Sequence, residues 1–311
     1  IKELYKKLKK KLLNMSMCYN ISAPAKLNLN LFIKHKKFKG LHFLESDICF
    51  LELSDKIYLR FSNKNAFFQN KDKSLMVDPK DNLILKAVQK FRSLTKWDKK
   101  FEIYLDKKIP IGAGLGGGSA NAAAVLILLR NLYNKEKKYN KLTFADIFEI
   151  SCELGSDIPA CLISKDLKLK GYGKEVQKNK IPNNYYYLII NPNIQLSTKD
   201  VFKKFSEYTD LRNEQKCMFF ENIKIYNSLL SSAISFAPQI SDILTKLNKI
   251  PNIIAYGMTG SGSTCFGIFK NLDDILNLSG IFKKEYFIWY GKKSNYKVNR
   301  VRSSKMLENK F

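Results

Sequence analysis

One glycine-rich stretch restricts the fold of this chain more than any other feature of its sequence. It runs from Pro110 to Ala120 and reads Pro-Ile-Gly-Ala-Gly-Leu-Gly-Gly-Gly-Ser-Ala, with five glycines among the seven residues from 112 to 118. An apolar run, Ala122 to Leu129, follows at once and predicts a buried helix. Glycine lets a backbone adopt positive φ and approach a ligand closely, and the first turn of a helix offers free N–H groups. The stretch therefore predicts an anion-binding loop at a helix N-terminus, and phosphate is the anion that we expect there.

This loop differs from the two commonest phosphate-binding patterns. It does not end in the Gly-Lys-Ser/Thr of a Walker A motif. A Gly-x-Gly-x-x-Gly match can be forced onto it, but the acidic ribose partner of a Rossmann fold, about 20 residues further on in a strand–helix–strand frame, is missing. The sequence therefore predicts phosphate binding by a different fold.

Histidine and cysteine usage excludes several reaction classes. The chain has two histidines, His35 and His42, so a site with three histidine ligands is impossible, and neither follows a nucleophile-elbow pattern. The six cysteines are scattered and form no Cys-x-x-Cys pair. We expect reduced, mostly buried thiols, as in a cytosolic protein, and no structural metal site.

The strong positive charge of the chain is open to two interpretations. The formal net charge is +26, from 54 lysines and arginines against 28 aspartates and glutamates. A surface that neutralises nucleic-acid phosphates is one interpretation. The lysines are spread along the chain rather than gathered in one arm, which favours a compositional origin, although such a field still attracts an anionic substrate. With no membrane-length apolar run and no leader-like start, we expect a cytoplasmic protein that binds neither membrane nor nucleic acid.

The hydrophobic pattern predicts a mixture of strands and helices. The expected elements, in chain order, are strands over 22–33, 44–53 and 56–61, a helix capped by Asp81 and reaching 94, a strand over 101–105, a helix reaching 133, a helix from Thr143 to Gly155, a strand over 185–190, several helices between 198 and 249, and strands over 253–257 and 264–269. Hairpin-like strands mixed with helices predict an α+β protein. We expect two domains, residues 18–178 and 179–311, after a basic extension over 1–17.

Three motifs give the chain a resemblance to a known family. The stretch from Pro110 to Ser119 resembles the central signature of the kinases named for galactose, homoserine, mevalonate and phosphomevalonate, the GHMP kinases. Ala23–Asn30 is similar to the N-terminal motif of that family, and Met258–Ser263 to its C-terminal glycine-rich motif, in the expected order. The resemblance implies an ATP-dependent small-molecule kinase that uses Mg²⁺. It also implies an N-terminal domain like domain 2 of ribosomal protein S5, which binds ATP, and a ferredoxin-like C-terminal domain, which binds the substrate.

Further motifs are similar to one branch of that family, which phosphorylates the 2-hydroxyl of a cytidine diphosphate-linked methylerythritol in non-mevalonate isoprenoid precursor biosynthesis. They are Pro24–Leu29, Gly40-Leu-His42 and Gly155-Ser-Asp-Ile-Pro159. The resemblance implies that Lys26 and Asp157 meet at the substrate hydroxyl as catalytic residues. The chemistry agrees, because a positioned carboxylate can accept the hydroxyl proton during phosphoryl transfer and an ammonium group can steady the nucleophilic oxygen.

The same resemblance implies roles for the remaining site residues. The expected ATP-binding residues are Asn82, Pro110, Gly112, Gly114, Leu115, Gly116, Gly117, Gly118, Ser119, Gly260 and Gly262. Ser119 is expected to reach Mg²⁺ or a phosphate, or to cap its helix. The expected substrate-binding residues are Asn28, His42, Thr198 and Phe202, with His42 on the cytosine edge and Phe202 on its face. Leu41 stands where the family usually has tyrosine, so one face of the base would meet an aliphatic side chain.

Two alternatives remain open at this point. The chain could be another GHMP kinase, for homoserine, mevalonate or a sugar, in which case His42 and Phe202 would have no cytosine to bind. It could also be a catalytically inactive RNA-binding protein on the same scaffold, in which case Lys26 and Asp157 would be dispensable and RNA affinity would fall steeply with salt. A monomer or a homodimer is expected in either case.

Overall fold

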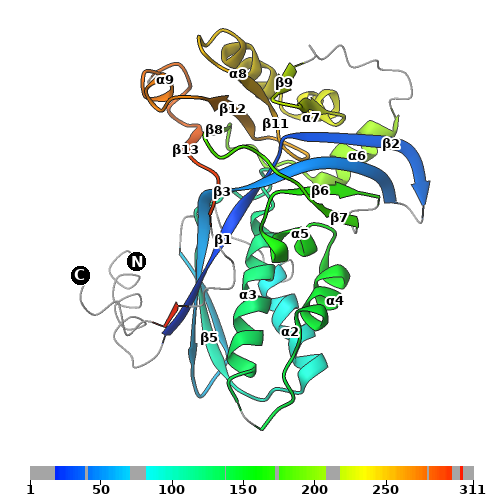
Figure 1. The fold of residues 1–311 in the computed structure, drawn as a ribbon, viewed down its shortest axis with the longest axis vertical. Coiled ribbons are helices and arrows are strands. Elements are labelled where there is room, and N and C mark those ends of the chain that lie inside the picture. Colours follow the sequence, from blue (N-terminus) through cyan, green and yellow to red (C-terminus); the bar gives the residue numbers. More distant parts are fainter. Residues whose placement is uncertain are drawn as a thin grey trace.

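One long strand organises the molecule. In the computed structural model, β3 (Leu41–Phe61) runs for 21 residues and pairs with strands along both of its edges (Figure 1). The sequence predicts two strands here, 44–53 and 56–61, and that prediction is wrong. The strand continues through Ser54 and Asp55 because these residues pair with Pro24 and Ala23 of the neighbouring strand.

The structure describes residues 18–38, 41–70, 82–136, 138–171, 175–207, 218–278, 280–295 and 302–303. The predicted basic extension over 1–17 lies outside them. The other strands are β1 (Cys18–Asn28), β2 (Asn30–Phe38), β4 (Ala66–Gln69), β5 (Phe101–Asp106), β6 (Leu167–Lys170), β7 (Glu175–Lys178), β8 (Tyr186–Asn191), β9 (Met218–Phe220), β10 (Ile223–Asn227), β11 (Ala255–Met258), β12 (Cys265–Phe269), β13 (Phe287–Gly291) and β14 (Arg302–Ser303). The helices are α2 (Leu83–Thr95), α3 (Gly117–Tyr133), α4 (Phe144–Leu154), α5 (Ile158–Ile163), α6 (Thr198–Glu207), α7 (Leu230–Phe236), α8 (Gln239–Asn248) and α9 (Asp273–Leu276).

The described strands form two sheets. The larger has the order β14-β1-β3-β2-β10-β9, with β5 and β6 also paired to β3, and the smaller has the order β11-β12-β8-β13. Figure 1 shows helices α2 to α5 beside the lower half of β1 and β3, and the smaller sheet with α7, α8 and α9 at the opposite end. The mixed α+β architecture predicted from the sequence is confirmed.

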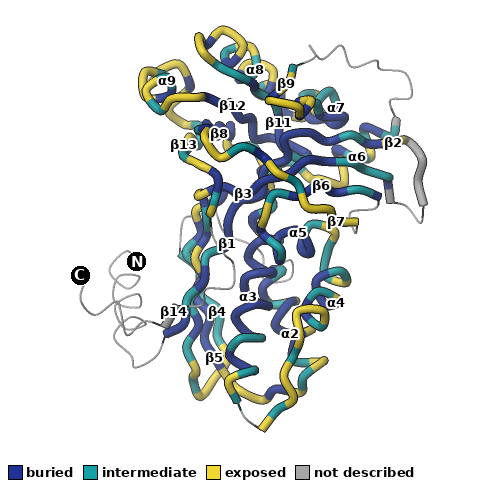
Figure 2. The backbone as a smooth tube through the Cα atoms, viewed as in Figure 1, coloured by how far each residue is buried: buried dark blue, intermediate teal, exposed yellow. Residues whose placement is uncertain are grey.

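Helix α3 lies at the centre of the hydrophobic cluster that is formed mainly by the N-terminal half of the chain. Its apolar run is buried almost throughout, and it appears dark blue along most of its length in Figure 2. Leu126 and Leu129 belong to the same hydrophobic cluster as Ile21 of β1 and Ile57 of β3. The helix that follows the glycine-rich loop is therefore anchored against the long strands, which fixes the loop at its N-terminus.

The smaller sheet is apolar on both faces. Successive side chains of a strand point to opposite faces, so β8 contributes to two clusters. Leu188 and Ile190 pack in the cluster that includes helices α7 and α8, whereas Tyr187 and Ile189 pack in the cluster that includes β1 and β3. The two halves of the chain are thus joined by a continuous hydrophobic contact.

The chain bends at Leu29, between β1 and β2. The sequence predicts one strand over 22–33, but β1 ends at Asn28 and β2 begins at Asn30. Leu29 N donates a hydrogen bond to Asp47 O, and the Asn30 side chain donates to Asp47 Oδ2 and accepts from Asp47 N. This pairing with a residue 17 positions further along the chain, rather than the apolar pattern, sets the strand boundary.

The N-terminal cap of α4 agrees with the sequence prediction, whereas that of α2 differs from it. Thr143 caps α4, and Asp146 completes a capping box with it, as the pattern predicts. Helix α2 is capped by Asn82, whose side chain accepts a hydrogen bond of 2.9 Å from Ile84 N. Asp81, the predicted cap, lies outside the described residues.

The cysteines in the described part of the chain are free thiols, as expected; they are Cys18, Cys49, Cys152, Cys161 and Cys265. Burial raises the pKa of Cys49 and that of Cys161 to about 12, so both thiols stay protonated near neutral pH. No helix among the described residues has the length and apolarity needed to cross a membrane.

A buried ion pair supports the loop that precedes the glycine-rich stretch. Lys107 Nζ lies 2.6 Å from Asp55 Oδ2, and the two side chains are 2% and 0% exposed. The other Asp55 oxygen accepts hydrogen bonds from the backbone N–H groups of Lys108 and Ile109. Burial lowers the pKa of Lys107, and the Asp55 carboxylate opposes that shift. Asp55 therefore holds both the charge and the backbone of this loop.

We expect Asp55→Asn to reduce the free energy of unfolding by about 3–5 kcal/mol, because it leaves the Lys107 ammonium buried without a counter-charge. Urea unfolding measures this. Glu153→Gln is the matched control, since Glu153 pairs with Lys90 at 2.6 Å on the exposed surface, where the loss should be small. Adding Lys107→Met to Asp55→Asn should recover part of the stability. Equal effects of the buried and exposed substitutions would contradict the role given to Asp55.

Candidate active site

A cavity of about 400 Å³ brings the three sequence motifs together. This volume lies within the range of small-molecule sites. Residues from the N-terminal motif, the glycine-rich loop, the start of α5, the start of α6 and the turn after β11 line it; they include Lys26, Asn28, Asn82, Pro110, Gly112, Gly114, Leu115, Gly116, Gly117, Gly118, Ser119, Ser156, Asp157, Thr198, Phe202, Gly260 and Ser261. Segments more than 200 residues apart in the chain, such as Asn28 and Gly260, therefore face one space.

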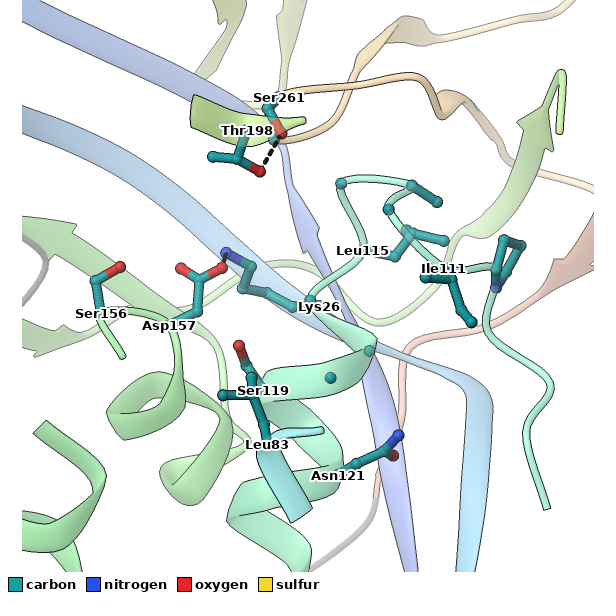
Figure 3. Close-up of a pocket in the computed structure, with 18 of the residues that line it drawn as sticks. Lys26, Leu83, Ile111, Leu115, Ser119, Asn121, Ser156, Asp157, Thr198 and Ser261 are labelled. Atoms are coloured by element: carbon teal, nitrogen blue, oxygen red, sulfur yellow. Dashed lines mark hydrogen bonds and ion pairs between the residues drawn. The ribbon is translucent and has the colours of Figure 1, made fainter. Parts of the chain in front are cut away.

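Lys26 and Asp157 form the ion pair that the resemblance implies. Lys26 Nζ lies 2.8 Å from Asp157 Oδ2, and Figure 3 shows the two side chains pointing toward one another. The lysine side chain is 5% exposed, whereas the aspartate is 41% exposed. The ammonium is thus fixed in the wall, and the carboxylate remains open to a ligand in the cavity.

Asp157 occupies the N-cap position of α5 but does not act as a cap. Its side chain makes no capping hydrogen bond and is turned toward Lys26 instead. A cap or turn role would be the ordinary explanation for an aspartate after Gly-Ser. The geometry favours a chemical role for the carboxylate.

Strand alternation explains why Lys26 and Asn28 share the cavity. Ala25, Leu27 and Leu29 are buried in the cluster shared with the smaller sheet, so the residues between them face the opposite way. Lys26 N also donates a hydrogen bond of 2.9 Å to Leu115 O, which attaches β1 to the glycine-rich loop. The period-two pattern of the sequence thus positions both polar side chains.

The glycine-rich loop contacts the second glycine-rich turn through backbone atoms. Gly114 has φ of +74°, and a Cβ on it would lie 2.4 Å from Thr259 O and 2.9 Å from Gly262 O. Gly260 has φ of +58°, and its Cβ would lie 2.7 Å from Gly114 O. No side chain fits at either position, so glycine is required for the two motifs to meet.

The end of the loop forms an open helix N-terminus. Gly116, in a left-handed conformation, is the N-cap of α3 and offers no side-chain cap, so the first-turn N–H groups are left for another partner. A Cβ on Gly116 would lie 3.3 Å from the Lys26 side chain, and one on Gly117 would lie 2.9 Å from Lys107 Nζ. Uncapped backbone N–H groups at a helix N-terminus, with two lysine side chains beside them, suit a phosphate. Ser119 is half-buried in the first turn and is not the cap.

The other wall of the cavity comes from α6 and the turn after β11. Thr198 Oγ1 lies 3.0 Å from Ser261 Oγ, a contact drawn in Figure 3. Phe202 lines the cavity one turn further along α6. His42 does not line it; its ring contacts the Phe202 ring at 5.7 Å, and its nitrogens contact Lys34 O and Ser206 Oγ. The side chain of Leu41 lies outside the described residues.

The expected ATP-binding residues do not all face the cavity. Asn82 lines it and also caps α2. Gly262 does not line it; a Cβ there would lie 3.0 Å from Met258 Sδ and 3.2 Å from Leu196 Cδ1, so this glycine serves packing behind the turn. The binding roles assigned to all these residues remain predictions.

Four polar or charged lining residues were not predicted from the sequence: Lys107, Asn121, Ser156 and Ser261. Asn121 is 3% exposed, and its Oδ1 has no hydrogen-bond partner. Asn121 could have been singled out from the sequence, because it is a polar residue directly before the apolar run of helix α3. Ser156 and Ser261 lie within the quoted motifs, whereas nothing in the sequence distinguishes Lys107 from its many lysine neighbours.

The donor set of the cavity fits Mg²⁺ brought in by a phosphate ligand. Among the described residues no group of three or more histidine, cysteine, aspartate or glutamate side chains is arranged to hold a metal ion. Mg²⁺ usually keeps several waters and binds through substrate phosphates with one or two protein oxygens. The Ser119 hydroxyl and the Asp157 carboxylate are oxygen donors in this cavity.

Comparisons with known proteins identify the family. The model of the GHMP kinases N terminal domain matches residues 82–165, and that of the GHMP kinases C terminal matches residues 217–287. The chain is similar to a 4-diphosphocytidyl-2-C-methyl-D-erythritol kinase of Prochlorococcus marinus subsp. pastoris, with 32% identity over 291 residues, 86% of this chain and 89% of that protein. The kinase of the same name from Clostridioides difficile is 32% identical over 297 residues, 90% of this chain and 94% of that protein.

Solved structures show the same fold. A crystal structure of 4-(cytidine 5'-diphospho)-2C-methyl-D-erythritol kinase matches with a TM-score of 0.72 at 24% identity, over 89% of this chain and 100% of that one. A homoserine kinase from Cytophaga hutchinsonii matches with a TM-score of 0.63 at 16% identity, over 90% of this chain and 96% of that one. The Prochlorococcus and Clostridioides proteins are each 32% identical to this chain over nearly their whole length. Together with the two domain matches, this identity shows that the chain belongs to the GHMP kinases.

Proposed function

We propose that this chain transfers the terminal phosphoryl group of ATP to the 2-hydroxyl of 4-diphosphocytidyl-2-C-methyl-D-erythritol. As a GHMP kinase it is an ATP-dependent small-molecule kinase, and the proposal concerns its acceptor and its chemistry. The observation that carries it is the Lys26–Asp157 pair, 2.8 Å apart beside an uncapped helix N-terminus. The names of the relatives support this acceptor, which serves isoprenoid precursor biosynthesis by the non-mevalonate route.

The geometry supports a simple division of labour. The exposed Asp157 carboxylate accepts the proton of the acceptor hydroxyl as the oxygen attacks, and the buried Lys26 ammonium stabilises negative charge on that oxygen. The glycine-rich loop and the start of α3 hold the phosphates through backbone N–H groups. Because phosphoryl transfer needs little covalent help from a protein, positioning and charge stabilisation account for most of the catalysis.

Mg²⁺ is part of this proposal. Bound to ATP, it would neutralise charge on the transferring phosphoryl group. Ser119, in the first turn of α3, would be its protein ligand, and Asp157 is the carboxylate that lines the cavity.

The α6 side of the cavity would hold the cytidine. Phe202 presents a ring to the cavity, and its contact with His42 fixes the ring position. Base–aromatic stacking contributes about 1–3 kcal/mol and does not select one base, so hydrogen bonds must do so. Thr198, which lines the cavity, is our candidate for those bonds, whereas His42, predicted for the same role, lies behind Phe202 with both ring nitrogens in contact with protein oxygens. The reduced state of the described cysteines supports the cytoplasm as the place of action.

Release of ADP from Mg-ATP tests the acceptor. We expect turnover with 4-diphosphocytidyl-2-C-methyl-D-erythritol and none above background with mevalonate, homoserine or galactose. Turnover with another alcohol would keep the kinase and overturn the acceptor, whereas inactivity with all four would favour the RNA-binding alternative.

We expect Asp157→Asn to lower kcat by about 10²–10⁴-fold, because the amide cannot accept the hydroxyl proton. Steady-state kinetics measure this, with circular dichroism to verify folding. Asp242→Asn is the matched control, since Asp242 is exposed on α8 and does not line the cavity. A loss of activity no greater than that of the control would exclude Asp157 as the base.

Phe202→Leu tests the cytidine site. The leucine keeps an apolar contact but removes the aromatic face, so KM for the cytidyl acceptor should rise about fivefold or more while KM for ATP stays unchanged. Phe236→Leu, at an exposed position of α7, should alter neither constant. Equal rises in the two KM values for Phe202→Leu would indicate a general structural defect and contradict stacking.

A further inference from the structure

The Asn28 side chain carries a buried oxygen without a partner. Asn28 is 3% exposed and lines the cavity that contains Lys26 and Asp157. Its Nδ2 donates a hydrogen bond of 2.8 Å to Ser46 Oγ, but its Oδ1 has no hydrogen-bond partner in the structure. A buried acceptor without a donor costs free energy. Because Asn28 is part of the cavity wall, a ligand group that donates to Oδ1 would remove that cost.

The bonds of Ser46 determine which end of the Asn28 amide is left over. Ser46 Oγ donates its single proton to Asn30 O, so toward Asn28 it can only accept. An acceptor at that point requires the NH₂ end of the amide, because the carbonyl end would place two acceptors in contact. Ser46 therefore keeps Nδ2 on its own side and leaves Oδ1 as the free acceptor.

The group that accepts the Ser46 proton is itself held in place. Asn30 follows the bend at Leu29, and its side chain exchanges two hydrogen bonds with Asp47: Nδ2 donates to Asp47 Oδ2 at 2.8 Å and Oδ1 accepts from Asp47 N at 2.6 Å. Ser46 is fully buried and does not line the cavity. The bend thus supplies a rigid carbonyl that orients the hydroxyl, and the hydroxyl orients the amide.

We propose that Ser46 is a positioning residue, which acts through Asn28 to present a hydrogen-bond acceptor to a hydroxyl group of the acceptor substrate next to Asp157. The inference rests on the proposed phosphoryl transfer to an alcohol. An oxygen that accepts a hydrogen bond there orients the alcohol for attack, and orientation of this kind affects the catalytic step more than ATP binding. Ser46 does not touch the substrate.

A double-mutant cycle on the full chain tests this. The variants are Ser46→Ala, Asn28→Ala and the double variant, and the measured quantities are kcat and KM for the acceptor alcohol and for ATP. We expect Ser46→Ala to lower kcat about tenfold in the wild-type background and less than about twofold in the Asn28→Ala background, because coupled residues give non-additive effects. KM for ATP should be unchanged throughout. Ser46→Thr, which retains the hydroxyl, should restore most of the activity.

Ser151→Ala is the matched control. Ser151 is also fully buried and donates a hydrogen bond of 2.6 Å to a backbone carbonyl, Phe148 O, but it lies on α4 away from the cavity. It should leave kcat unchanged in both backgrounds. If Ser46→Ala does not yield folded protein, Ser46→Cys replaces it in the cycle, because a thiol is a weak acceptor of similar size.

The outcomes separate this inference from the proposed function. The cycle uses whichever acceptor the wild type phosphorylates, so a wrong acceptor in the proposal leaves the test of Ser46 intact. Equal losses from the Ser46 substitution in both backgrounds, or no loss in either, would overturn the positioning role. A wild type that phosphorylates no alcohol would overturn the inference together with the function on which it rests.

Discussion

The close approach of two backbone segments is the constraint on which the site depends. Gly114 lies so near Thr259 and Gly262 that a single added carbon would be 2.4 Å from a carbonyl oxygen. Around this contact, Thr259 Oγ1 accepts a hydrogen bond from Asn28 N, and Asn227 Nδ2 donates to Met258 O and Gly260 O. The phosphate loop, the N-terminal strand and the C-terminal turn are therefore held as one surface, and the hydrophobic clusters on either side keep them in register.

Two buried lysines beside the cavity illustrate how environment separates structural from chemical roles. Lys107 and Lys26 are both almost inaccessible, and each lies within hydrogen-bond distance of one carboxylate. Asp55 is wholly buried and accepts from the ammonium and two backbone N–H groups, so no ligand can reach it. Asp157 is 41% exposed, so a ligand can reach it. The same pair of residue types thus stabilises a loop in one place and offers a proton acceptor in the other.

Local chemistry could be predicted from the sequence, whereas features that depend on distant partners could not. The glycine-rich loop, helix α3 and the Thr143 cap follow from backbone freedom, apolar runs and side-chain capping, all encoded within a few residues. The Lys26–Asp157 contact was inferred only through the family resemblance, because 131 positions separate the two residues. The continuity of β3, the bend at Leu29 and the strand β10 were missed, since each is set by hydrogen bonds to segments that are distant in the sequence. Strand β9 was also missed, although it pairs with the neighbouring β10. The Ser46 hydroxyl had no local signal at all.

The length of β3 has a consequence for how this molecule can be divided. Ile48, Phe50, Ile57 and Leu59 pack on the helical side, while Cys49, Leu51 and Leu53 of the same strand pack against the smaller sheet. Leu51 also forms a bridge with Lys293, far along the chain. Both hydrophobic clusters therefore share β3, and separating the two halves of the chain would expose apolar side chains of each cluster to water. Chimaeras that exchange one half between relatives would have to carry the matching face of this strand, so acceptor specificity is more readily altered by grafting α6 and its neighbouring turn than by exchanging whole domains.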